Sequence, residues 1–259
     1  MDKCTVKDIC NIMNSIAPEE YAEGFDNVGL LVGDKNAEVT GILLALDATA
    51  ESVDLAVQNG CNMIVTHHPL IFSPLKSVTT DDAVGSVVYK LIQNGIALYS
   101  AHTNFDKIPG GTDDMLAEAV GIISPARLEE DELGFGRLGN IPPTTARELK
   151  DNLSQRLGAS VITTADDNKP ISTVATVAGS GGDFVELAIK NNVDLFITGE
   201  MNYHTALDAK RLGLDVMLCS HHASEQISLK SLKTSLQNRL NSVQYTVKVI
   251  SSPISRFWS

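Results

Sequence analysis

The stretch Ile64-Val65-Thr66-His67-His68-Pro69 constrains the fold more than any other part of the chain. The short apolar run from Cys61 to Val65 follows the turn pair Asn59-Gly60, which is typical of a buried strand. Pro69 cannot continue a strand ladder because it has no backbone N–H. The pattern therefore predicts two imidazoles at the carboxyl edge of a sheet, where open α/β sheets bind their ligands.

Alternating strands and helices surround this stretch. Apolar spacing and turn residues predict a helix at 5–16, strands at 25–33 and 42–46, a helix at 53–58, a strand at 61–65, a helix at 82–93, a strand at 96–100 and a helix at 113–120. Strand, helix and strand at this spacing form a βαβ unit with parallel pairing. We therefore expect an α/β protein.

The second half of the chain repeats this pattern. Residues 173–178 and 193–198 are predicted strands on either side of a helix at 184–190. A constant offset aligns Asp47 with Gly179, Thr66 with Thr198, and His67-His68 with Gly199-Glu200. We interpret the repeat as an internal duplication of one α/β unit. The alternative is chance similarity between two ordinary βαβ units.

The two halves are expected to meet at residues 121–145. Prolines, glycines and the acidic run Glu129–Glu132 fall together there, which is typical of a connecting segment. We therefore predict an N-terminal α/β lobe over residues 1–124 and a C-terminal α/β lobe over 125–259. The lobes are expected to form one compact two-lobed unit, in which they face each other across a metal-containing cleft.

All six histidines stand at or just after predicted strand ends, namely His67, His68, His102, His204, His221 and His222. His221 and Glu225 are four residues apart, so a helix that begins near Ser220 places them on one face. An imidazole and a carboxylate at this spacing suit a divalent first-row metal.

Other residues enlarge this set of candidate metal ligands. With His67, His68 and Asp106 it has three imidazoles and two carboxylates, which is more than one tetrahedral zinc accepts. Such a set fits a two-metal site with ions about 3.5–4 Å apart. His222 is an alternative to His221 as a ligand.

Three further residues are candidates for proton transfer, namely His102, Glu200 and His204. Glu200 precedes His204 by four residues, so it could hold the His204 ring or act as a base. The glycine-rich turn 179–182 is compatible with an anion cradle at a helix N-terminus and equally with a plain tight turn.

Composition limits the partners of the protein. The net charge of −12 argues against nucleic acid and against an anionic membrane surface, because both attract positive charge. The four cysteines have no CxxC spacing, which is typical of reduced thiols in a cytosolic protein. The N-terminus has no apolar run of signal-peptide length. We therefore expect a cytoplasmic protein.

Five blocks of the sequence resemble those of a known family, in the same order: 25–30 (FDNVGL), 66–69 (THHP), 101–106 (AHTNFD), 194–200 (DLFITGE) and 220–225 (SHHASE). The chain resembles the type 2 GTP cyclohydrolase I homologues, also called NGG-interacting-factor-three-like proteins, in their short form without an inserted domain. It departs from the family at Phe25, where tryptophan is common, and at Ser220-His221-His222, where Gly-His-Tyr or Gly-His-Phe is frequent. Neither departure removes a ligand.

The resemblance implies two similar α/β lobes across a cleft and a toroidal homohexamer built from three dimers. It also implies two divalent metal ions, of a kind left open among Zn, Fe, Mn, Co and Ni. The implied ligands are His67, His68, Asp106, His221 and Glu225, with Glu225 bridging the ions and His102 close by.

Two functions are compatible with the sequence. The first is a dinuclear metal-dependent hydrolase in which activated water attacks C8 of GTP, releases formate and leads to dihydroneopterin triphosphate. The same site also suits the hydrolysis of a phosphoester. The second is a metal-binding scaffold or regulatory interaction protein without catalysis, as the interaction-based family name suggests.

Overall fold

The computed structural model describes residues 3–253, which form two compact units. The first unit runs to Phe105 and resumes at Leu229, and the second unit is Asp106–Ser228. This division differs from the predicted boundary between residues 124 and 125. There are two reasons: residues 112–120 pack in the core of the second unit, and the last strand of the chain returns to the first sheet, where it pairs with β2. The ends of the two predicted domains, residues 1–2 and 254–259, lie outside the described residues.

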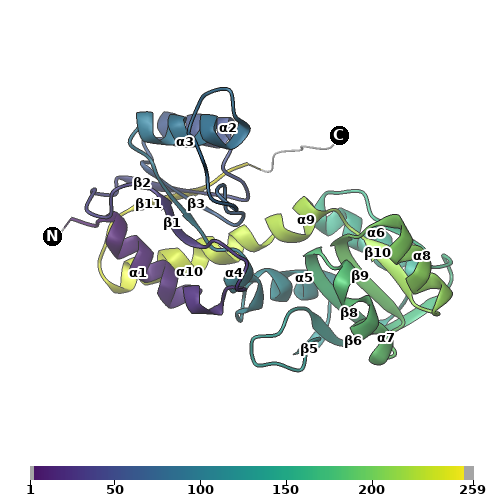
Figure 1. Cartoon of the computed structure of the whole chain (residues 1–259). Helices are drawn as coiled ribbons and strands as arrows, with labels where there is room; N and C mark the ends of the chain where they lie inside the picture. The colour runs from purple at the N-terminus through teal and green to yellow at the C-terminus, as the bar shows by residue number, and fades with distance from the viewer. Residues whose placement is uncertain (1–2, 254–259) are drawn as a thin grey trace. The chain divides into compact units, whose positions relative to one another are not determined.

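The first unit contains a five-stranded sheet in the order β1-β4-β3-β2-β11, in which only β1 is antiparallel to its neighbour (Figure 1). Its elements are α1 (Val6–Ile16), a 3-10 turn (Glu19–Tyr21), β1 (Gly29–Val32), β2 (Gly41–Ala45), α2 (Ala50–Gln58), β3 (Met63–Thr66), α3 (Ala83–Gln93), β4 (Ala97–Ser100), α10 (Ser228–Ser242) and β11 (Lys248–Ser251). The short helix α4 (Thr103–Lys107) spans the first crossing to the second unit.

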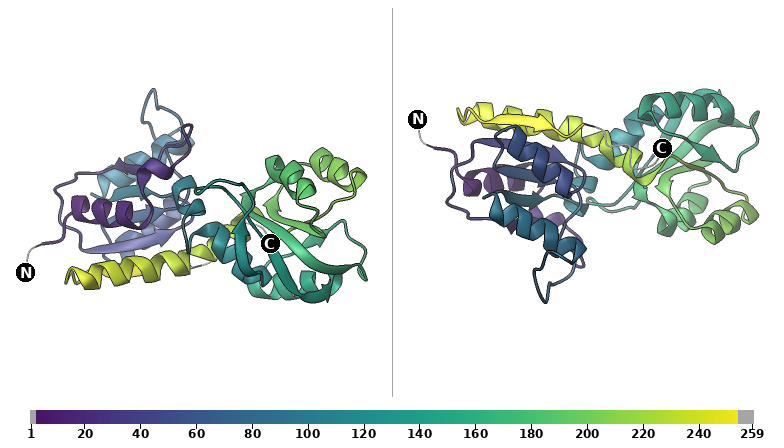
Figure 2. Two further views of the ribbon diagram at one scale, coloured as in Figure 1. Left: turned by 90° about the horizontal axis from the view of Figure 1, so that it is seen from below. Right: turned by 90° about the horizontal axis from the view of Figure 1, so that it is seen from above.

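Helices cover both faces of this sheet, which explains why β2, β3 and β4 are buried along their whole length. Leu43, Ile64 and Leu98 pack with α2 and α3 on one face. The helices α1 and α10 cover the other face (Figures 1 and 2). Strands buried on both faces read as continuous apolar runs, and this is the pattern that predicted them.

The second unit contains a six-stranded sheet in the order β5-β6-β8-β9-β10-β7. Its elements are α5 (Thr112–Val120), β5 (Ile123–Arg127), β6 (Arg137–Thr145), α6 (Ala146–Leu157), β7 (Ile162–Thr163), β8 (Pro170–Ser180), a 3-10 turn (Gly182–Phe184), α7 (Val185–Lys190), β9 (Leu195–Glu200), α8 (Tyr203–Arg211), β10 (Asp215–Leu218) and α9 (His221–Gln226). Only β8, β9 and β10 are mutually parallel.

Alternating residues of the parallel strands enter two different cores. Val174, Leu195 and Met217 pack with α5, α6 and α9 on one face of the sheet. Phe196 and Val216 pack with α7 and α8 on the other. The alternation follows from the two-residue period of a strand. It holds the carboxyl ends of β8, β9 and β10 at one edge.

The segment expected to connect the lobes is instead a pair of strands, β5 and β6, and this prediction was wrong. Its prolines occupy positions that a sheet tolerates. Pro125 lies in β5, which is an edge strand, and Pro142-Pro143 lie where the β6–β8 register shifts between Asn140 and Thr144. The acidic run Glu129–Glu132 forms the loop between the two strands.

The two units repeat one topology, which supports the predicted duplication. An α-helix, an antiparallel edge strand and a parallel β-α-β-α-β unit follow one another in each, and the strand orders β1-β4-β3-β2 and β7-β10-β9-β8 correspond. The registers also correspond, since Ala45 pairs with Thr66 as Val177 pairs with Thr198. The same sequence offset relates both pairs.

Candidate metal donor sets

Three histidines meet at the carboxyl edge of the first unit. His67 and His68 follow β3, where the chain bends, and His102 follows the neighbouring strand β4. The ring centroid of His67 lies 5.1 Å from that of His68 and 5.1 Å from that of His102. Each ring offers one nitrogen, and these nitrogens lie within 4.8 Å of one another. We call His67, His68 and His102 the imidazole set.

Each ring of the imidazole set has an oxygen acceptor at Nδ1. The distances are 3.0 Å from His67 Nδ1 to the carbonyl oxygen of Ala101, 2.8 Å from His68 Nδ1 to Asp47 Oδ1, and 3.0 Å from His102 Nδ1 to Asp26 Oδ1. A carbonyl or an ionised carboxylate can only accept, so Nδ1 carries the hydrogen in each ring. Nε2 is then the nitrogen that carries the lone pair, and it is the usual ligand atom of a histidine whose Nδ1–H has an oxygen acceptor.

The second unit presents a different set of donors. His221 begins α9, and its Nε2 lies 3.1 Å from Glu225 Oε1 one helical turn later. The predicted sharing of one helix face by His221 and Glu225 is therefore confirmed. The Nδ1 atom of His221 lies 3.1 Å from Glu200 Oε1, at the end of β9. We call His221 and Glu225 the carboxylate set. Asp106 lies in α4, which follows β4, and it is the first residue of the second unit.

The two remaining histidines lie apart from these contacts. His204 is exposed on α8, and its ring packs against Tyr203 with centroids 5.4 Å apart. Glu200 contacts His221, whereas the sequence had suggested that it could hold the His204 ring or act as a base. His222 follows in α9, but the contact with Glu225 is made by His221.

Asp106 lies near a second, fully buried carboxyl. Burial raises the pKa of Asp113 to about 7, and the negative charge of Asp106 adds to the rise. Asp113 accepts hydrogen bonds from the backbone amides of Gly136 at 2.6 Å and Ala178 at 2.9 Å. Arg137 lies 3.9 Å from Asp113, and its positive charge acts to lower the same pKa.

Gly179 leaves room for the carboxylate set. It has a φ of +64°, and a Cβ at this position would overlap Glu225 Oε1 and lie 3.4 Å from His221 Nε2. The predicted glycine-rich turn therefore serves a close approach of the backbone to two donor side chains. The donor types and this cradle both fit a divalent metal ion.

Sequence reasoning missed the supporting role of Asp26 and Asp47. Asp47 lies two residues after β2 and directly follows the predicted strand 42–46, and Asp26 lies within the predicted strand 25–33. The histidines were selected because they follow predicted strands, and the same criterion would have selected Asp47. Asp26 approaches His102 from a loop before β1, and no spacing rule indicates that contact.

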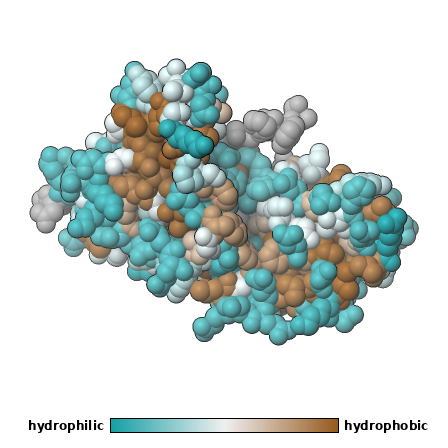
Figure 3. All heavy atoms as spheres, viewed as in Figure 1, coloured by the Kyte–Doolittle hydropathy of each residue, from teal (hydrophilic) through white to brown (hydrophobic). Residues whose placement is uncertain are grey.

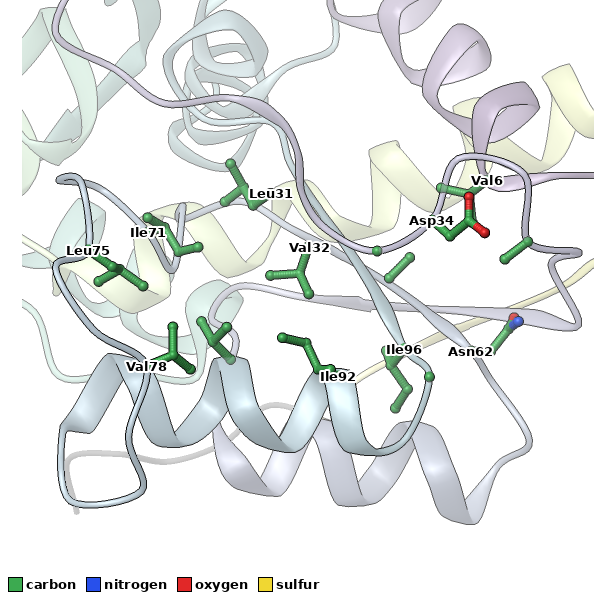
Figure 4. A pocket seen from close by; sticks show the side chains of 15 residues that line it. Val6, Leu31, Val32, Asp34, Asn62, Ile71, Leu75, Val78, Ile92 and Ile96 are labelled. Atoms are coloured by element: carbon green, nitrogen blue, oxygen red, sulfur yellow. The ribbon is translucent and has the colours of Figure 1, made fainter.

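A separate cavity in the first unit has a volume of about 590 Å³ and contains none of these donors (Figure 4). Apolar side chains line most of it, among them Leu31, Ile71 and Ile92. Ala97 and Asn62, which also line it, stand at the amino ends of β4 and β3, whereas the imidazole set follows the carboxyl ends. Figure 3 shows hydrophobic side chains gathered on the surface of this unit between α1 and α3.

Comparison with known proteins identifies relatives along almost the whole chain. A sequence model of the family Duf34/NIF3 (NGG1p interacting factor 3) matches residues 4–256. A Clostridium perfringens protein named GTP cyclohydrolase 1 type 2 homolog is 41% identical over 243 residues, which cover 92% of this chain and 93% of the relative. A Clostridium acetobutylicum protein of the same name is 35% identical, with 95% of each chain covered.

Solved structures agree with these sequence matches. The Staphylococcus aureus hypothetical protein SA1388 matches with a TM-score of 0.94 and 29% identity, covering 100% of this chain and 99% of that one. Reduced HcgD from Methanocaldococcus jannaschii matches with a TM-score of 0.82 and 28% identity, covering 97% of this chain and 98% of that one. Within residues 3–253 no helix is long and apolar enough to cross a membrane.

Proposed function

The chain belongs to the Duf34/NIF3 (NGG1p interacting factor 3) family, and we propose that it is a metal-dependent hydrolase acting on a nucleotide. The proposed ligands of two divalent ions are His67, His68, Asp106, His221 and Glu225. The observation that carries the proposal is the hydrogen-bonding of the histidines. In His67 and His68, Nδ1 faces an oxygen acceptor, so that Nε2 carries the lone pair; in His221, Nδ1 faces Glu200 while Nε2 faces Glu225, a second proposed ligand.

The chemistry divides between the metal and the protein. When bound, divalent ions supply Lewis acidity and lower the pKa of a water toward neutrality. Asp47 and Glu200 hold the rings of His68 and His221 in one orientation and one tautomer. His102 is the proposed proton acceptor, because its Nε2 lies on the side of the ring opposite the Asp26 contact.

GTP is the proposed substrate. The support for it is the name of the two clostridial relatives, GTP cyclohydrolase 1 type 2 homolog. The proposed reaction is attack of water at C8 of guanine, with ring opening, loss of formate and rearrangement to dihydroneopterin triphosphate. We also propose a homohexamer of three dimers, which the mass of the assembly in solution tests directly.

The test is turnover of GTP by the metal-reconstituted protein, with nucleotides separated by chromatography and formate assayed. The matched pair of variants is Asp106→Asn and Asp208→Asn, because Asp208 is an exposed carboxylate that pairs with Arg211 on the surface. Formate release that requires metal, survives in Asp208→Asn and is lost in Asp106→Asn supports the proposal. Phosphate without formate indicates a phosphohydrolase. No product from a metal-loaded protein rejects GTP as substrate and favours a binding role.

A further inference from the structure

The sequence block Phe25–Leu30 has no role in the proposed chemistry, yet two of its residues contact the segments that carry the histidines. Asp26 reaches His102 and Thr103 at the start of α4. The side-chain amide of Asn27 donates a hydrogen bond to the carbonyl oxygen of Ile71, in the loop that follows His68 and Pro69. A segment far away in the sequence thus contacts both chain segments that carry the imidazole set.

The hydrogen bonds around Asp26 allow only one assignment of hydrogens. The hydroxyl of Thr103 accepts a hydrogen bond from the backbone amide of Glu23 at 2.9 Å, so it donates its own hydrogen to Asp26 Oδ2 at 2.6 Å. The backbone amide of Thr103 donates to the same oxygen at 3.1 Å. Oδ2 therefore accepts from two donors, and Oδ1 faces His102 Nδ1 and also accepts from the backbone amide of Asn27 at 2.8 Å.

The carboxylate of Asp26 is fully shielded from solvent, whereas 21% of the His102 side chain is exposed. A buried carboxylate next to an imidazole fixes the ring in the tautomer with hydrogen on Nδ1, as acidic partners of functional histidines commonly do. The Nε2 lone pair then points away from Asp26. His67 and His68 lie on the other sides of the ring, with centroids at 5.1 and 5.5 Å.

We propose that Asp26 is a positioning residue that fixes the tautomer of His102 and keeps its Nε2 lone pair available as a proton acceptor. The proposal deepens the proposed function and rests on it for the purpose of that lone pair. The tautomer itself is a property of the metal-free protein, and it can be measured without any turnover.

The informative variant is Asp26→Asn. The two Thr103 donors require an oxygen, so the amide oxygen of the substituted side chain replaces Oδ2. The NH2 group then takes the place of Oδ1, where it loses the hydrogen bond from the Asn27 amide and is directed at His102 Nδ1. A donor at that place forces Nδ1 to accept and moves the ring hydrogen to Nε2. Asp8→Asn is the matched control, because Asp8 also accepts from the backbone amide and hydroxyl of a threonine, Thr5, at the start of α1.

The measurement is the nitrogen-15 spectrum of the histidine rings in metal-free protein near pH 8, assigned with His102→Gln. We expect Nδ1–H for His102 in wild type and in Asp8→Asn, and Nε2–H in Asp26→Asn. An Nε2–H tautomer in wild type overturns the proposal even if the variant does not fold. An unchanged tautomer in a folded Asp26→Asn overturns it as well.

Turnover of GTP is measured separately on the same proteins. General acid–base groups contribute about 10²–10⁴-fold to rate, so kcat should fall at least tenfold in Asp26→Asn with little change in KM. If the tautomer changes and kcat does not, the Nε2 lone pair of His102 is not the proton acceptor. Absence of turnover in wild type rejects the proposed function instead, while the spectrum still decides the tautomer.

Discussion

The imidazole set and the carboxylate set occupy equivalent edges of two copies of one topology, but they differ in chemistry. The first unit supplies imidazoles, with carboxylates such as Asp47 behind them. In the second unit the carboxylate Glu225 faces the site, and a single imidazole, His221, is held by Glu200. Glu200 occupies the position that the sequence offset aligns with His68. At this position of the duplicated unit, the first copy therefore has a candidate metal ligand, His68, and the second copy has a residue that supports a ligand, Glu200.

This difference has a consequence for metal preference. Imidazole favours borderline ions such as zinc, iron and nickel, and carboxylate oxygen favours harder ions such as manganese. Both copies of the fold place polar residues at the carboxyl edge of the sheet, and the types of these residues determine which metal ion is preferred. Four tests, with five substitutions, check or refine this comparison.

The largest effect is expected from Gly179→Ala. The added Cβ overlaps Glu225 Oε1, so the carboxylate set loses its geometry, and we expect the affinity for Zn²⁺ to fall by about 100-fold or more. Gly158→Ala is the control, because Gly158 has a similar φ of +62° with nothing within 4 Å of the added atom. Chelator competition measures the affinity. Equal losses in both variants would contradict the role of Gly179 as a cradle.

The next effect compares the supporting carboxylates Asp47 and Glu200. Loss of such a partner typically reduces metal affinity by about 10–100-fold, and we expect this range for Asp47→Asn and Glu200→Gln. The loss should be smaller for Glu200→Gln, because α9 and the contact with Glu225 also hold His221. Calorimetric titration with Zn²⁺ measures both. If either variant binds Zn²⁺ with wild-type affinity, that carboxylate does not support a metal-binding histidine.

Ser220→Gly tests how the second unit accommodates an extra residue. Ser100 and Leu218 pair with equivalent positions of their sheets, yet His102 follows Ser100 by two residues and His221 follows Leu218 by three. Ser220 lies in this interval at φ 73°, which costs a non-glycine residue about 1–3 kcal/mol.

We therefore expect Ser220→Gly to raise the free energy of unfolding by about 1 kcal/mol in urea denaturation, with Zn²⁺ affinity unchanged. The variant also loses the hydrogen bond from the Ala223 amide to the Ser220 hydroxyl, at 3.4 Å, which reduces the gain by only about 0.3 kcal/mol. A less stable glycine variant would show that Ser220 is not strained.

The smallest effect lies at the amino edges of the two sheets. Asn62 in the first unit accepts from the Thr40 amide at 2.8 Å, and Asp194, aligned with it by the offset, accepts from the Ser172 amide at 2.8 Å. Burial acts to raise the pKa of Asp194, but hydrogen bonds from the backbone amides of Thr173 and Ser172 outweigh it and lower the pKa.

A carboxyl with a lowered pKa stabilises the fold above its unfolded pKa, about 3.9, and this contribution is lost as the pH falls through the folded value. We expect Asp194→Asn to cost no more than about 1 kcal/mol at pH 7, because the group is partly exposed. The difference from wild type should shrink below about pH 4. Urea denaturation at several pH values measures it, and the exposed Asp208→Asn is the control. A difference that does not change with pH would contradict the assignment.

The sequence predicted the parts of this structure that depend on local pattern. Continuous apolar runs located the parallel strands, and turn residues located their ends, so the histidines at those ends were identified with the correct edge. The four-residue spacing of His221 and Glu225 predicted their contact because helix geometry fixes it.

What the sequence did not predict depends on contacts between distant residues. β11 joins the first sheet after the chain has left it, and no local signal in Lys248–Ser251 reveals its partner. The prolines near residues 125 and 142 led to the wrong prediction of a connecting segment. A sheet tolerates proline in an edge strand or at a register shift, and neither position can be recognised until the strand order is known. The contact between Asp26 and His102 belongs to the same class.

The most direct test of the account is the metal content of the purified protein after saturation with Zn²⁺ and removal of free ion, measured by elemental mass spectrometry. We expect two ions per chain in wild type and in Asp208→Asn, and fewer in Asp106→Asn. A wild-type protein that retains no ion, or an Asp106→Asn variant that retains as many as wild type, would contradict it.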